Sequence, residues 1–174
     1  MGNVVDVLKL SVEKEHMRAA IYREAAEATS NPLAKATFAA LAKDEEKHEV
    51  YLKAYYDKQV AEAGWPAVGE IMEDEDSLAV VEQIFKYANA MIAKAGECSE
   101  DLSAVYDSAI AAEIESVHLY TDAMHHSTDP NAKAFFQVLV DVEKMHAKLL
   151  AETQDYLDDT SKWFFDEEHW GVEG

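Results

Sequence analysis

The sequence predicts an all-α fold, a four-helix bundle of two antiparallel helical hairpins joined by a long crossover that contains a short helix. Glycine and proline are scarce, at 6 and 3 of the 174 residues, and residues that favour helices are plentiful. The chain also repeats itself. Residues 11–52 align with 109–150 at a constant offset of 98 without a gap, and twelve of the 42 paired positions are identical, where composition alone would give roughly three. Each copy is long enough for one hairpin.

The predicted long helices cover residues 4–29, 32–60, 100–127 and 130–158. The turn of each hairpin is marked by a residue that caps helices followed by a proline, Asn31-Pro32 in one copy and Asp129-Pro130 in the other. Proline suits the first helical position because its missing amide hydrogen would have no partner there. Two tight hairpins are therefore expected.

The remaining segments connect or follow the hairpins. We expect the acidic run at 73–76 to be a solvated loop and residues 77–94 to form the short helix of the crossover. Residues 1–159 would then form the bundle. Residues 160–174, which include Trp163 and Trp170, form an aromatic tail that we expect to pack on the bundle or on a partner subunit.

Composition limits the functions open to the chain. A formal net charge of −20 disfavours binding to nucleic acid or anionic membranes and attracts cations. The single cysteine, Cys98, excludes an internal disulfide and a four-cysteine iron or zinc module within this chain. Residues 1–12 contain no long hydrophobic stretch, so neither a signal peptide nor a membrane span is expected, and we expect a cytoplasmic protein.

The repeat preserves residues that bind metals. Each copy carries Glu-x6-Tyr followed by Glu-x2-His. The conserved pairs are Glu15/Glu113, Tyr22/Tyr120, Glu45/Glu143 and His48/His146. At about 100° per residue, Glu15 and Glu113 lie in the middle of apolar helical stripes, and the Glu-x2-His pairs share faces with Phe and Leu side chains. All six ligand-type residues should therefore point into the core.

Two further Glu-x2-His matches, Glu13 with His16 and Glu115 with His118, lie on other faces. Both glutamates are about 160° away from the apolar stripes, and their histidines are also well off the centre of these stripes. We therefore expect them to face solvent and to bind no metal, although they have the same Glu-x2-His motif.

The buried carboxylates suggest a two-metal site. The alternative is that these residues are partly buried and pair only with one another. Four ionised carboxylates would then be destabilised by a large desolvation free energy, or they would stay protonated. Two neutral histidines would not offset their negative charge. Two divalent metals would balance the four negative charges, and mixed carboxylate and imidazole ligands suit iron or manganese.

Each residue has an expected role. Glu45 and Glu143 would bridge the metals, Glu15 and Glu113 would bind one metal each, and His48 and His146 would provide one imidazole per metal. Tyr22 and Tyr120 would donate hydrogen bonds to the ligand carboxylates. The alternative role of the two tyrosines is simple core packing.

The paired motifs, spanning 15–146, resemble the ferritin-like di-iron superfamily and within it the rubrerythrin-related branch. The aromatic, acidic ending of the chain is also similar to endings of rubrerythrin-like proteins. The resemblance implies two iron ions per chain, with manganese or mixed metal as variants, and chemistry on hydrogen peroxide or dioxygen. It also implies a homodimer, in which hairpins could be exchanged between subunits.

One position departs from the family pattern. Rubrerythrins commonly place an additional Glu three residues after the terminal Glu of the third helix, where this chain has Ser116. This departure leaves open whether the redox-linked iron movement associated with that Glu occurs here.

The function expected from the sequence is a di-iron peroxidase that reduces hydrogen peroxide to water. Because no rubredoxin-type module is expected within this chain, electrons would come from an external donor such as a rubredoxin. Two alternatives use the same ligands. One is a ferroxidase that oxidises ferrous iron for storage, and the other is an oxygenase that acts on an organic substrate.

Overall fold

The computed structural model describes residues 4–72 and 102–158, and all regular structure in these ranges is helical. The elements are α1 (Val4–Ala28), α2 (Pro32–Val60), the 3-10 helix η1 (Val68–Glu70), α4 (Ser103–His126) and α5 (Pro130–Asp158). The all-α prediction is confirmed. The predicted ends of α2 and α5 agree with the structure, whereas α1 and α4 end one residue earlier than predicted and α4 begins at Ser103.

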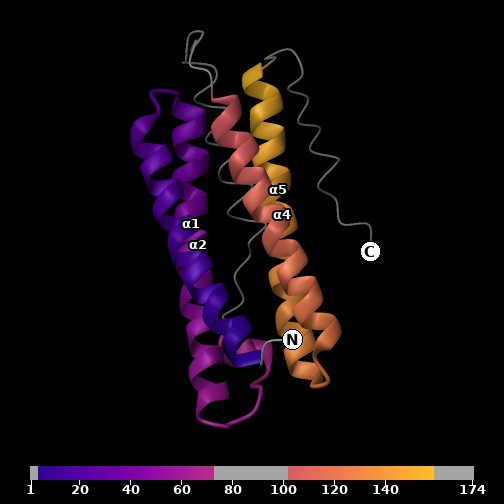
Figure 1. The fold of residues 1–174 in the computed structure, drawn as a ribbon. Helices are drawn as coiled ribbons and strands as arrows, with labels where there is room; N and C mark the ends of the chain where they lie inside the picture. The colour runs from indigo at the N-terminus through magenta and orange to yellow at the C-terminus, as the bar shows by residue number, and fades with distance from the viewer. Residues whose placement is uncertain (1–3, 73–101, 159–174) are drawn as a thin grey trace.

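The helices form two antiparallel hairpins that lie side by side, α1 with α2 and α4 with α5 (Figure 1). The two hairpin turns lie at opposite ends of the bundle. The end of α2 and the start of α4 also lie at opposite ends, so the hairpins are joined by a crossover rather than by a short loop. The short helix predicted at 77–94, the acidic run at 73–76 and the tail at 160–174 lie outside the described residues.

Side-chain caps begin the second helix of each hairpin. Asn31 Oδ1 accepts hydrogen bonds from the amides of Leu33 and Ala34, at 2.9 and 3.1 Å. Asp129 Oδ1 accepts from the amides of residues 131 and 132, at 2.8 and 3.3 Å. These bonds satisfy amide groups that have no partner inside the helix. The tight turns predicted from Asn-Pro and Asp-Pro are therefore present.

Two hydrophobic clusters fill the bundle, one on each side of its middle. The first contains Tyr22, Phe38 and Tyr106 and lies toward the α1–α2 turn. The second contains Tyr120 and Phe136 and lies toward the other end. Along α1 and α2, the predicted ligands Glu15, Glu45 and His48 lie between these clusters. The apolar clusters thus place a polar layer in the middle of the core and keep water away from it.

The segment after α2 closes one end of the bundle. The Trp65 ring lies near Tyr55, Phe135 and Phe136, with ring centroids 5.6, 6.1 and 5.7 Å away. Asn131 Nδ2 donates a hydrogen bond of 3.0 Å to the backbone oxygen of Trp65. This segment therefore contacts the start of α5 and ties the first hairpin to the second.

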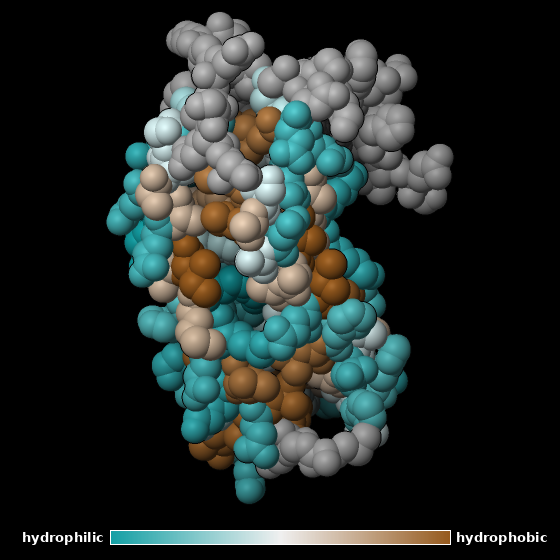
Figure 2. Space-filling view, turned by 45° about the horizontal axis from the view of Figure 1, so that its top comes forward, coloured by the Kyte–Doolittle hydropathy of each residue, from teal (hydrophilic) through white to brown (hydrophobic). Residues whose placement is uncertain are grey.

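The surface mixes hydrophilic and hydrophobic residues, and hydrophobic side chains gather toward the lower end of the face in Figure 2. No helix in the described ranges is both long and apolar enough to cross a membrane.

Candidate metal centre

The structure brings the six predicted ligand residues together in the middle of the bundle. Each long helix contributes to the group. Glu15, Glu45, Glu113 and Glu143 are fully buried, and His48 and His146 are 4% and 2% exposed. We call this group of six residues the carboxylate cage. The spacing of three residues between Glu and His within α2 and within α5 places both side chains on the same face of the helix.

The cage contains two overlapping sets of possible ligands. Ligand atoms of Glu15, Glu45, His48 and Glu143 lie within 4.8 Å of one another. Ligand atoms of the set that contains His146 are equally close, and its other members are Glu45, Glu113 and Glu143. Glu45 and Glu143 belong to both sets, which is the geometry required of carboxylates that bridge two metals.

Each tyrosine reaches across to the other hairpin. The Tyr22 hydroxyl donates a hydrogen bond to Glu113 Oε1, and the Tyr120 hydroxyl donates one to Glu15 Oε1. These hydrogen bonds fix the two terminal carboxylates in orientation. The sequence indicated hydrogen bonds from these tyrosines to the cage but did not indicate that the bonds would cross between hairpins.

A buried cation that the sequence analysis missed lies inside the cage. Arg18 Nη1 donates hydrogen bonds of 2.7 Å to Glu113 Oε2 and 3.1 Å to Glu143 Oε2. Arg18 Nη2 lies 2.5 Å from Glu15 Oε1 and 3.4 Å from Glu45 Oε2. One guanidinium therefore contacts all four glutamates.

Arg18 corrects the charge argument made from the sequence, which considered only the histidines as protein partners of the carboxylates. The signal was available in the spacing, because Arg18 follows Glu15 by three residues and so shares its helical face. Its counterpart in the repeat is Ser116, whose hydroxyl accepts a 2.8 Å hydrogen bond from Arg18 Nη1.

Asp44 is a second residue that the sequence analysis missed. Its Oδ2 lies 2.9 Å from His146 Nε2, while His146 Nδ1 faces Glu45 Oε1 at 3.0 Å. A carboxylate on the far nitrogen is the usual way to orient a histidine that binds a metal through its other nitrogen. Asp44 directly precedes Glu45 and has Val142 as its repeat counterpart, so the repeat pattern did not reveal it.

The pKa values of Glu15, Glu45 and Glu143 are shifted in opposite directions within the cage. Burial and the nearby charge of Glu15 raise the pKa of Glu45 to about 6. Burial and the charge of Glu45 raise the pKa of Glu143 well above its ordinary value. Burial acts the same way on Glu15, but contacts with Glu45 and His48 and the charge of Arg18 outweigh it and lower the pKa of Glu15. Divergent pKa values within one buried group are typical of functional sites.

Both cage histidines hold protons strongly. Burial opposes their charged form, but contacts with Glu15 and Glu45 outweigh it and raise the pKa of His48 to about 9. Contacts with Asp44 and Glu45 likewise raise the pKa of His146 to about 10. A metal that binds either ring nitrogen must therefore displace a proton at neutral pH.

The two other Glu-x2-His matches lie on the surface, as the helical-face argument predicted. Glu13, His16, Glu115 and His118 are all exposed. His16 Nδ1 pairs with Glu49 at 3.0 Å, and Glu115 pairs with Lys14 at 2.8 Å. Neither match contributes to the cage.

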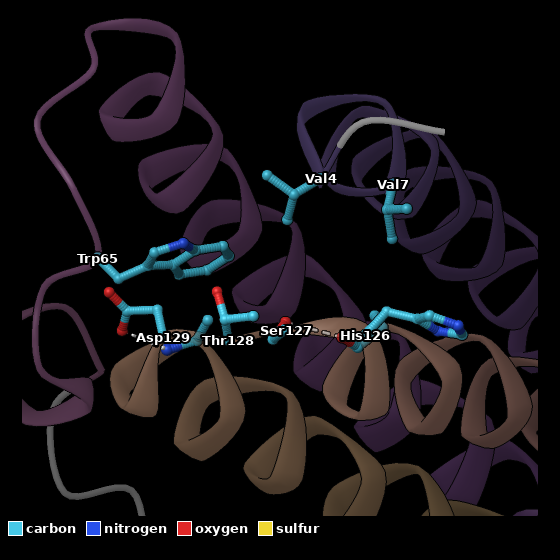
Figure 3. Close-up of a pocket in the computed structure, with 9 residues that line it drawn as sticks. Val4, Val7, Trp65, His126, Ser127, Thr128 and Asp129 are labelled. Carbon is cyan, nitrogen blue, oxygen red and sulfur yellow. Dashed lines mark hydrogen bonds between the residues drawn. The ribbon is translucent and has the colours of Figure 1, made fainter. Parts of the chain in front are cut away.

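A separate cavity of about 220 Å³ lies at one end of the bundle (Figure 3). Val4 and Val7 of α1, Trp65 and the residues of the α4–α5 turn line it. Glu15 follows Val7 by eight positions along α1, roughly 12 Å of helix. No residue of the cage lines this cavity.

The donor set of the cage fits two divalent metals. Four carboxylates and two imidazoles supply two four-ligand sets, and one set presents buried atoms that no hydrogen bond satisfies. A bundle of two antiparallel hairpins with this polar layer defines the ferritin-like class of carboxylate proteins. A family model described as Rubrerythrin matches residues 6–154, and the chain belongs to that family. A search of curated proteins and a search of solved structures found no significant match.

Proposed function

We propose that this protein is a di-iron oxidoreductase that reduces hydrogen peroxide to water with electrons from an external donor. The observation that carries the proposal is the pair of overlapping ligand sets that share Glu45 and Glu143. When bound, two ferrous ions supply the two electrons that hydrogen peroxide needs, with two protons, to become two molecules of water. Manganese or a mixed pair of metals would suit the same ligands.

The protein's own residues hold the centre in place. Glu45 and Glu143, from the second helix of each hairpin, belong to both ligand sets and would therefore hold the two metals side by side. Tyr22 and Tyr120 orient the terminal carboxylates. The aromatic clusters on both sides of the cage exclude water, which strengthens every electrostatic interaction inside it.

The electrons must enter from outside this site. Cys98 is the single cysteine of the 174 residues, so these residues do not supply a four-cysteine iron module. A separate protein such as a rubredoxin fits this role. The family match supports a ferritin-like di-iron protein, and the choice of hydrogen peroxide as substrate is part of the proposal.

Anaerobic stopped-flow oxidation tests the reaction. Protein loaded with ferrous iron is mixed with hydrogen peroxide or with dioxygen, and the absorbance of ferric iron is followed. We expect oxidation by peroxide to be at least about tenfold faster and to be reversed by a reduced rubredoxin. The Glu45→Ala variant should lose the reaction, and the surface variant Glu13→Ala should keep it.

Two results would redirect the proposal. Equal or faster oxidation by dioxygen, with ferric mineral accumulating under excess ferrous iron, would assign the site to a ferroxidase. Turnover of a co-purified organic ligand would indicate an oxygenase. The cavity in Figure 3 lies away from the cage, so it gives no support to a substrate channel beside the metals.

A further inference from the structure

One half of the cage presents unsatisfied atoms. The side-chain atoms Glu15 Oε2, Glu45 Oε2, Glu143 Oε1 and His48 Nδ1 are buried and have no hydrogen-bond partner. The three oxygens lie 3.8, 3.4 and 3.7 Å from His48 Nδ1. Buried polar atoms without partners are costly. A cation among these four atoms would satisfy them all, and we call this group the His48 half.

The residues of the set that contains His146 are already engaged with one another or with Arg18. Glu113 Oε2 and Glu143 Oε2 both accept from Arg18 Nη1, at 2.7 and 3.1 Å. His146 Nδ1 lies 3.0 Å from Glu45 Oε1. We call this group the His146 half. Here a metal would compete with a guanidinium for the same carboxylate oxygens.

The difference between the halves originates in two positions where the repeat is broken. Arg18 has Ser116 as its counterpart, and Asp44 has Val142. Arg18 is 5% exposed, and its Nη1 also donates to the Ser116 hydroxyl at 2.8 Å. Because a serine stands at the symmetric position, the cage contains one guanidinium. Its Nη1 donates hydrogen bonds to Glu113 and Glu143. Its Nη2 lies 2.5 Å from Glu15 Oε1 and 3.4 Å from Glu45 Oε2 but makes no hydrogen bond there.

The total charge of the cage shows how the guanidinium affects a second metal. With all four glutamates ionised and both histidines neutral, the glutamates, Arg18 and one divalent ion together carry −1, and a second divalent ion brings this total to +1. With a neutral residue at position 18, the second ion would instead bring the total from −2 to 0. The guanidinium therefore opposes completion of the metal pair, because the pair would otherwise leave the cage neutral.

We propose that Arg18 serves as a built-in cation of the His146 half, so that the centre binds its two metals unequally. The first divalent ion binds the His48 half. The second binds the His146 half only when the guanidinium releases Glu113 and Glu143. This inference rests on the proposed function, because it requires that both halves bind metal.

Calorimetric titration with Mn²⁺ tests the inference on the full chain after treatment with a chelator. Wild-type protein should show two binding events whose Kd values differ by at least about tenfold. Arg18→Met removes the charge and keeps an unbranched stem, so the second Kd should fall at least about tenfold and approach the first. The matched control is Arg23→Met, because Arg23 lies on the exposed surface of α1 and pairs with Glu46. It should titrate like the wild type.

Two histidine variants test the order of filling without altering Arg18. His48→Ala should lose the tighter event, and His146→Ala should lose the weaker one. The opposite pattern would overturn the proposal even if Arg18→Met failed to fold.

Two equal sites in the wild type, unchanged in Arg18→Met, would reject the unequal centre and leave the proposed function standing. Absence of Mn²⁺ and Fe²⁺ binding in both proteins would reject both proposals. A thermal scan adds a readout that is independent of activity. In the absence of metal, Arg18→Met should unfold at a lower temperature than the wild type. Added Mn²⁺ should raise the unfolding temperature of the variant more than that of the wild type.

Discussion

Glu45 and Glu143 are the two residues shared by both ligand sets, so their side chains should contribute most to metal binding. Replacing either with Ala removes a ligand from both sets and leaves positive charge unbalanced in the core. We expect the Glu45→Ala and Glu143→Ala variants to lose paired metal binding. Metal content of the folded, purified proteins, measured by mass spectrometry, checks this.

The surface matches provide a control with the same local sequence. Glu13→Ala and Glu115→Ala should keep their metal content within error, because both side chains are exposed and surface changes are usually small in effect. An equal loss of metal in these two variants would contradict the helical-face argument on which the ligand assignment is based.

Metal binding should strengthen as pH rises from about 6 to 8. The pKa values of His48 and His146 are raised to about 9 and 10, so both rings are protonated across this range and a metal must displace their protons. Each step up in pH reduces that competition. The apparent Kd for Mn²⁺, measured in buffers of matched ionic strength, should therefore fall with pH. A Kd that stays constant or rises would contradict the protonated state of the rings.

At the scale of the helices, the caps of α2 and α5 make a measurable contribution to stability. Asn31→Ala and Asp129→Ala remove side chains that accept two amide hydrogen bonds each. Each variant should lose about 1 kcal/mol of unfolding free energy. Chemical denaturation checks this, with the exposed Lys35→Ala as a control that should change little. Metal content should be unchanged, since both turns lie at the ends of the bundle.

The helices and their order could be predicted from the sequence because local signals agree with the repeat. Asn-Pro and Asp-Pro mark both turns, and apolar stripes place Glu15 and Glu113 inward. The residues that break the repeat could not be found in this way. The spacing of Arg18 from Glu15 places it on the inward face of α1, but its contacts with carboxylates on other helices depend on tertiary packing that no periodicity encodes. Asp44 was missed for the same reason, because its partner is His146 of another helix, α5.

At the scale of the whole molecule, removing the metals should lower stability without unfolding the protein. Metal binds the folded cage in preference to the unfolded chain, and a free concentration of 100 times the Kd contributes about 2.7 kcal/mol. Arg18 continues to offset part of the carboxylate charge. Differential scanning calorimetry should show a cooperative transition in both states, at a lower temperature after chelation. Identical transition temperatures would mean that the cage does not bind the metal in its native form.

The homodimer, the exchange of hairpins and the packing of the aromatic tail stay predictions. They depend on partner chains and on residues 73–101 and 160–174, which lie outside the described ranges. Analytical ultracentrifugation of the full chain would distinguish a dimer from a large storage particle, and with it the peroxidase from the ferroxidase.

The crossed tyrosine bonds have a consequence for the ancestry of the fold. Tyr22 of the first hairpin donates to Glu113 of the second, and Tyr120 of the second donates to Glu15 of the first. A single hairpin could therefore complete neither half of the centre. An ancestor encoding one hairpin would have needed a second copy of itself, and strict twofold symmetry would have placed two arginines in one cage or none. Two hairpins within one chain are free of that restriction. Once both copies lay in one chain, position 18 could become arginine while position 116 was serine, and a symmetric site could acquire two unequal halves.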